Sequence, residues 1–130
     1  MKTKQLLLLV LMMIVPMISS AKKLSFTIGG PEDSYNRICV VNETSQENFN
    51  CRLVILDDND EKIAVYGVYH LKSEGDEDSN SSWIGRGARI GIQMPKDFPL
   101  EVSFSVEYYD RPFYDYIIIR LYDNTTEFDE

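Results

Sequence analysis

Apolar and polar residues alternate most regularly late in the chain, over residues 100–122. From Val102 to Val106 every second residue is apolar, which is the period of a strand with one buried face. A four-residue loop around Pro112 interrupts the run, and residues 114–122 continue it with β-branched and aromatic side chains. We therefore predict a hairpin with one apolar face. Its expected cross-strand pairs are Tyr109 with Tyr114, Val106 with Ile117, Phe104 with Ile119, and Val102 with Leu121.

Five further segments have strand character and are separated by turn signals. They are residues 24–28, 37–41, 51–56, 63–71 and 83–94. Gly67 is expected to mark a β-bulge, and the ten polar residues at 73–82 are expected to form a mobile loop. No segment has the periodicity of a helix.

These seven strands predict an all-β fold, a single antiparallel β-sandwich with immunoglobulin-like architecture. It is not a true immunoglobulin domain, because Cys39 and Cys51 are too close in sequence to join its second and sixth strands. Trp83 also lies outside the interval between the two cysteines.

The first residues are typical of a signal peptide. Lys2 and Lys4 precede an apolar run at 6–17, and small residues at 19–21 form a cleavage site. We predict a signal peptide at 1–21, a secreted domain at 22–122 and an acidic flexible tail at 123–130. The run is shorter than the about 20 residues of a membrane span, and no later stretch is long and apolar enough.

Two cysteines in an exported chain predict one disulfide, Cys39 to Cys51. The bond would staple the strands at 37–41 and 51–56 into a hairpin. Closing a loop of this length would stabilise the folded protein by roughly 3 kcal/mol, because the bond restricts the unfolded chain.

The chain is acidic, with 13 Lys and Arg against 21 Asp and Glu and a formal net charge of −8. Removal of the signal peptide with its two lysines takes the charge to −10. This charge argues against nucleic acids and anionic membranes as partners and permits cations and basic proteins. Its simplest role is to keep the protein soluble.

Three N-x-[ST] sequons begin at Asn42, Asn80 and Asn124. All three lie in segments that we expect to be loops or tail, and export supplies the right compartment. We therefore predict a glycoprotein if the source is eukaryotic.

Acidic runs at 57–61 and 74–78 suggest calcium. The EF-hand template fails at both, since Ser81 stands where glycine is required and Lys62 occupies a ligand position. A looser site with weak calcium binding remains an alternative. His70 is the only histidine, and no nucleophile motif accompanies it. We predict no catalytic residue, no resident metal and no cofactor, hence no enzyme.

The outer face of the predicted hairpin is rich in tyrosine. The candidate partner-binding residues are Tyr109, Tyr114, Tyr116, Ile118, Arg120 and Tyr122. Tyrosine and arginine are enriched at protein interfaces, and tyrosines also stack on sugar rings. Two plainer explanations are that a neighbouring strand or the tail covers this face, or that tyrosine simply suits strands.

The first functional hypothesis is a small secreted binding module of the venom, salivary, immune or host-directed type. It would bind an extracellular protein or glycan through the tyrosines or through the loops at one end. The alternative is an acidic extracellular matrix or calcium-responsive structural protein.

Overall fold

The computed structural model describes residues 24–31, 33–110 and 115–124. These residues form ten strands and no helix, so the all-β prediction is confirmed. The strands are β1 (Leu24–Thr27), β2 (Ser34–Tyr35), β3 (Arg37–Glu43), β4 (Phe49–Leu56), β5 (Lys62–Leu71), β6 (Glu77–Asn80), β7 (Ile84–Gly85), β8 (Arg89–Gln93), β9 (Val102–Asp110) and β10 (Asp115–Asp123). None of these residues belongs to a helix long and apolar enough to cross a membrane. The predicted signal peptide at 1–21 and the tail from residue 125 lie outside the described residues.

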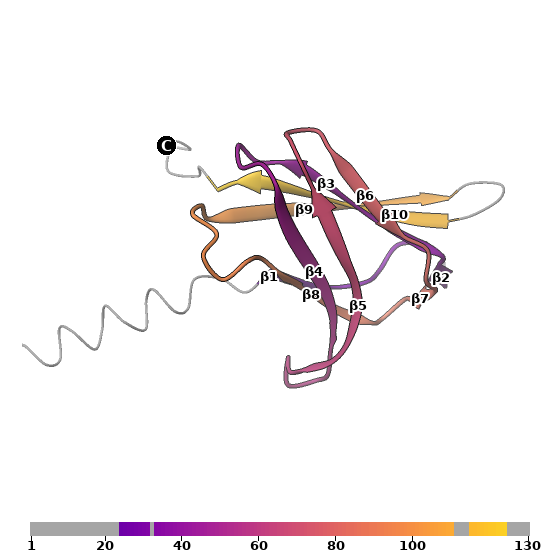
Figure 1. Cartoon of the computed structure of the whole chain (residues 1–130). Helices are drawn as coiled ribbons and strands as arrows, with labels where there is room; N and C mark the ends of the chain where they lie inside the picture. Colours follow the sequence, from indigo (N-terminus) through magenta and orange to yellow (C-terminus); the bar gives the residue numbers. More distant parts are fainter. Residues whose placement is uncertain (1–23, 32, 111–114, 125–130) are drawn as a thin grey trace, which may run out of the picture.

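The strands form two four-stranded sheets and one two-stranded sheet (Figure 1). The first sheet has the order β1-β8-β4-β5, the second has the order β6-β3-β10-β9, and β2 pairs with β7. The prediction of one antiparallel sandwich of about seven strands is not confirmed. The structure has several sheets, and β3 runs parallel to β10.

A single hydrophobic core contains side chains from both four-stranded sheets. In β10 the two-residue alternation buries Ile117, Ile119 and Leu121 completely. Leu53 of β4 and Ile90 of β8 contribute fully buried side chains from the other sheet. Both sheets therefore bury one apolar face in the core.

The predicted final hairpin exists, but its register differs from the prediction by two residues. Tyr109 pairs with Tyr116, and Val106 pairs with Ile119. A two-residue shift keeps every side chain on the predicted face, so the apolar pattern cannot distinguish the two registers. Tyr114 lies outside the described residues, and the last described pair before the turn is Asp110 with Asp115.

The predicted cysteine-stapled hairpin is wrong. β3 and β4 follow each other in the chain but belong to different sheets. Ile38 and Val40 fill the core, so Cys39 between them points to the opposite face of its sheet, whereas Cys51 is fully buried. Both cysteines are free thiols, and the Cys39–Cys51 disulfide is not formed.

We expect the two thiols to differ in reactivity. Burial raises the pKa of Cys51 to about 12 and also raises the pKa of the half-buried Cys39, and only a thiolate reacts with iodoacetamide. Alkylation of the folded protein should therefore be slow at Cys39, faster as the pH rises, and undetectable at Cys51. Mass spectrometry of the protein alkylated with and without urea checks this. A Cys39–Cys51 linked peptide from unreduced protein would contradict it.

The polar segment at 73–82, predicted to be a mobile loop, contains strand β6. Its side chains bond to the backbone of β5: Asn80 Nδ2 donates to the Tyr66 carbonyl at 2.7 Å, and the His70 N–H donates to Asp78 Oδ2 at 2.9 Å. Gly67 lies at a bulge, as predicted, because the register of β4 with β5 shifts beside it. A Cβ at this position would stand 2.6 Å from Nδ2 of Asn80, so a side chain here would displace the amide that donates to the Tyr66 carbonyl.

Candidate binding surface

The sheet β6-β3-β10-β9 has one face in the core and one face outward. We call the outward side chains of β3, β10 and β9 the open face. Its members are Arg37, Cys39, Val41 and Glu43 on β3, Tyr116, Ile118, Arg120 and Tyr122 on β10, and Ser103, Ser105, Glu107 and Tyr109 on β9. All of these side chains except Val41 are half-buried or exposed, and 37% of the surface of Tyr122 is exposed. The described candidate residues therefore share one surface.

Two tyrosines from neighbouring strands stack on the open face. Tyr109 and Tyr116 are direct cross-strand partners, their ring centroids are 5.0 Å apart, and the ring planes differ by 13°. Arg37 of β3 is the next residue in the same cross-strand row. The shift of the hairpin register produces this pair, because the predicted register places Tyr109 opposite Tyr114.

A polar network crosses the same face. Glu107 accepts hydrogen bonds from the Tyr109 hydroxyl at 2.7 Å and from Arg120 Nε at 3.1 Å. These two groups, the hydroxyl first, hold the pKa of the Glu107 carboxyl below its ordinary value. Arg120 Nη1 also donates to Glu43 at 3.2 Å. The network links side chains of three strands on this face.

The sequence analysis missed the contribution of β3 to this surface. Parallel pairing places Val41 beside Arg120 and Cys39 beside Ile118, although each pair is 79 residues apart in the chain. The alternation within β3 indicates which of its residues share a face. No local pattern indicates which distant strand lies beside it.

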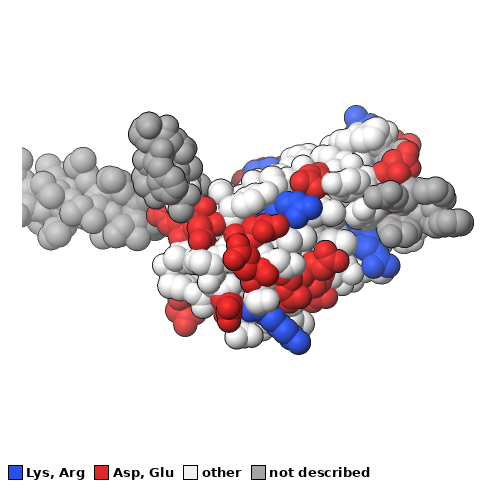
Figure 2. All heavy atoms as spheres, turned by 90° about the horizontal axis from the view of Figure 1, so that it is seen from above, with Lys and Arg blue, Asp and Glu red and all other residues white. Residues whose placement is uncertain are grey.

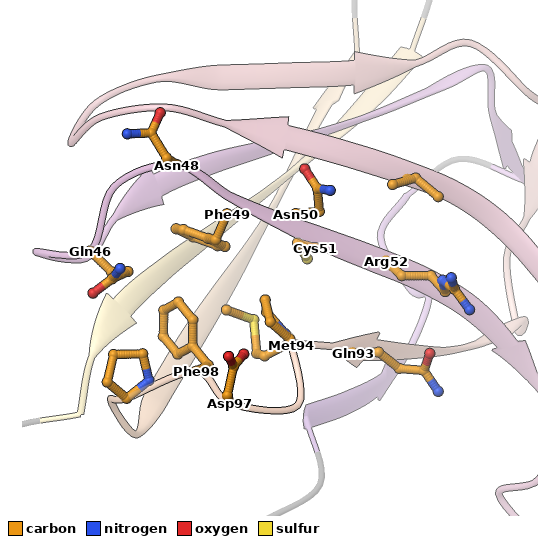
Figure 3. Close-up of a pocket in the computed structure, with 13 residues that line it drawn as sticks. Gln46, Asn48, Phe49, Asn50, Cys51, Arg52, Gln93, Met94, Asp97 and Phe98 are labelled. Carbon is orange, nitrogen blue, oxygen red and sulfur yellow. The ribbon is translucent and has the colours of Figure 1, made fainter.

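A cleft of ≈ 600 Å³ opens at one end of the first sheet (Figure 3). It exists because β8 pairs with β4 only as far as Gln93 and Arg52, after which the chain turns away at Pro95. Phe49 and Phe98 meet edge to face inside it, with ring centroids 4.8 Å apart. Figure 3 shows Met94 close to this pair and Gln46, Asp97 and Arg52 around it. The loops at this end therefore form a second candidate surface that is small and partly apolar.

The acidic loops use their carboxylates within the protein. Asp57 Oδ1 accepts hydrogen bonds from the backbone N–H groups of Asn59 and Glu61, and Asp60 pairs with Arg89 at 2.6 Å. In the second run, Asp76 Oδ2 accepts the Lys72 N–H at 2.8 Å. Within 24–31, 33–110 and 115–124, no three His, Cys, Asp or Glu side chains are arranged to hold a metal ion.

His70 lies exposed on β5. Its Nδ1 is 2.7 Å from Oδ1 of Asn50, its cross-strand partner on β4. This contact links the side chains of two neighbouring strands on the surface.

The three sequons occupy different environments. Asn42, predicted to lie in an exposed loop, is fully buried at the end of β3. Asn80 lies on β6 rather than in a loop, and Asn124 follows β10, where its N–H donates to the Glu101 carbonyl at 2.8 Å. The prediction that Asn42 carries a glycan conflicts with its burial.

The surface is predominantly acidic. Figure 2 shows Asp and Glu gathered in the middle of one side of the molecule, with fewer Lys and Arg among them.

Comparisons with models of protein families, with curated proteins and with solved structures find no match to this chain.

Proposed function

We propose that this chain is a secreted, non-enzymatic binding module of β-sandwich architecture that binds an extracellular protein through the open face. The observation that carries the proposal is the stacked Tyr109–Tyr116 pair beside the Glu107–Arg120 network on the outward face of the sheet. Tyrosine and arginine supply a large share of the binding energy at protein interfaces.

Preorganisation supports this proposal. Binding normally costs the rotamer entropy of every side chain that becomes ordered. Here the contacts of Tyr109, Glu107 and Arg120 with one another already restrict these side chains. Exposed ion pairs contribute little to stability, so holding a fixed surface is the more effective role of this network.

Two features support a binding module rather than a hydrolase. Among the described residues, the cleft is lined by a single carboxylate, Asp97, whereas acid–base hydrolysis of a glycoside uses two. His70 contacts the side-chain amide of Asn50. This contact activates no nucleophile, and an amide does not orient the imidazole as the carboxylate of a catalytic triad does.

The alternative, a calcium-responsive matrix protein, has less support. Asp57, Asp60 and Asp76 already bond to backbone N–H groups or to Arg89. Calcium binding would have to compete with these bonds, and a ligand of the folded state raises the melting temperature. A melting temperature that is equal in calcium and in chelator is expected, and an increase of several degrees in calcium would favour the alternative.

A binding experiment with matched variants tests the proposed function. The mature protein is used as bait in extracellular fluid, beside a Tyr116→Ser/Ile118→Ser variant. The control is Val65→Ser/Val68→Ser, which removes two apolar side chains, 48% and 47% exposed, from the other sheet. We expect the wild type and the control variant to capture the same protein. The open-face variant should capture at least about tenfold less of it.

Two outcomes would contradict the proposal. One is a partner retained equally by both variants, and the other is a partner lost only with the control. Thermal melts of all three proteins establish that they are folded. Release of the captured partner by glycosidase treatment would indicate a glycan ligand instead of a protein.

A further inference from the structure

Three of the four outer edges of the large sheets are protected. β1 and β6 contain four residues each, and β6 is acidic. β5 has two register irregularities, and its backbone is bonded by the side chains of Asn80 and Asp78. Short strands, charges and bulges are the usual means by which proteins prevent pairing at sheet edges.

The fourth edge, β9, is long and regular, although it carries two carboxylates, Glu107 and Asp110. It contains nine residues from Val102 to Asp110, without proline or lysine, and its pairing with β10 shows no irregularity. The Asn124 N–H donates to the Glu101 carbonyl, so the odd-numbered residues of this strand direct their backbone groups towards β10. The even-numbered residues, including Phe104 and Val106, therefore direct their N–H and C=O groups outward.

The core is also open along this edge. Phe104, Val106 and Tyr108 face the core but are only half-buried, whereas Ile117 and Ile119 on the neighbouring strand are completely buried. Phe104 contacts Phe26, and Tyr108 contacts Tyr35 and accepts the Gly29 N–H at 3.0 Å through its hydroxyl. A strand added beside β9 would cover their remaining apolar surface.

We propose that β9 pairs antiparallel with β9 of a second copy of this chain. A twofold axis at Val106 gives full overlap of the two strands. It places Ser105 opposite Glu107 of the second copy and Phe104 opposite Tyr108 of the second copy. An axis one residue further along would place Glu107 against its own symmetry mate, which is unfavourable. Full overlap of the two strands and avoidance of the Glu107 pair therefore favour the axis at Val106.

This dimer joins two four-stranded sheets into one continuous sheet of eight strands. The open faces of the two copies then lie side by side on the same surface. The inference does not rest on the proposed function, because it is argued from the outward-directed backbone groups and the half-buried core side chains of β9. Of the open face, Ser105 and Glu107 lie at the dimer seam.

Substitutions of opposite charge at Ser105 test the dimer, and thermal melts of both variants establish that each remains folded. In the monomer Ser105 is the cross-strand partner of Arg120, so glutamate there faces an opposite charge and lysine a like charge. In the dimer, Ser105→Glu would face Glu107 of the second copy twice, once on each side of the axis. Ser105→Lys would instead form two opposite-charge pairs across the interface.

Sedimentation equilibrium of the mature protein gives the first measurement. We expect a dimer at about 100 μM, about tenfold weaker association for Ser105→Glu, and association at least as tight for Ser105→Lys. A wild type that remains monomeric at this concentration would overturn the proposal. Equal dissociation of the two variants would also overturn it.

Amide hydrogen exchange gives a second measurement that does not depend on the variants. The N–H groups of Phe104, Val106 and Tyr108 should exchange more slowly as the concentration of the wild type rises, because pairing protects them. The N–H groups of Ser105 and Glu107 already bond to β10 and should not change. Concentration-dependent protection at any other edge would place the interface elsewhere and refute this one.

Discussion

Replacing Ile119 by alanine is expected to lower the free energy of unfolding by about 2–5 kcal/mol. The same replacement at the neighbouring Ile118 is expected to cost less than about 1 kcal/mol. Ile119 is completely buried in the core, whereas Ile118 lies half-buried on the open face. The two changes delete the same atoms from adjacent residues, so the difference measures the effect of burial alone. Urea denaturation of the two variants and the wild type gives both values.

A pair of charged variants extends this test. Ile119→Asp would place an unpaired carboxylate in the core and is expected to prevent folding, while Ile118→Asp should remain folded. Equal losses at the two positions would mean that β10 does not present opposite faces to the core and to solvent. The strand assignment and the open face would then both be wrong.

The second large effect is expected at Asn42. Its Nδ2 donates to the carbonyls of Gln46 at 2.9 Å and Ser73 at 3.2 Å, and its Oδ1 accepts the N–H of Thr44 at 2.9 Å and the hydroxyl at 2.6 Å. Alanine at this position removes all four hydrogen bonds, and the two with Thr44 are buried. The expected loss of unfolding free energy is about 3 kcal/mol or more. Thermal and urea unfolding measure it.

The same contacts make a glycan at Asn42 incompatible with the fold. An N-linked sugar replaces one of the two hydrogens of Nδ2, both of which donate to backbone carbonyls, and the Asn42 side chain is fully buried. We therefore expect mass spectrometry of protein secreted from eukaryotic cells to find no sugar on the Asn42 peptide. Asn124→Gln is the control, because it removes a sequon outside the core. Full occupancy of Asn42 in folded, secreted protein would contradict the structure around it.

The sequence predicts the parts of this fold that local patterns control. Alternation places Ile117, Ile119 and Leu121 on one face, and Gly67 marks a bulge. The sequence does not predict β6, because this edge strand is held by backbone pairing and by polar side chains and needs no apolar residue. The Cys39–Cys51 prediction fails for a related reason, since neighbouring strands in sequence can enter different sheets.

The candidate surface also has features that local patterns predict and features that depend on distant strand pairing. Tyr116, Ile118 and Arg120 share a face because they alternate along one strand, and the sequence shows this directly. Their contacts with Glu43 of β3 and with Glu107 in the observed register depend on distant pairing. Periodicity determines the composition of a face, whereas the tertiary fold determines which faces adjoin.

The parallel pair of β3 with β10 determines the order in which the protein can be assembled. β10 lies between β3 and β9, and it is the last strand among the described residues. During synthesis, the sheet β1-β8-β4-β5 has all its strands available before β10 is made. The other sheet must wait for residues 115–123, so a ribosome-bound or truncated chain lacking them leaves β3 and β9 without their shared neighbour. Folding of this protein is therefore expected to be slow, as is typical of distant strand pairing.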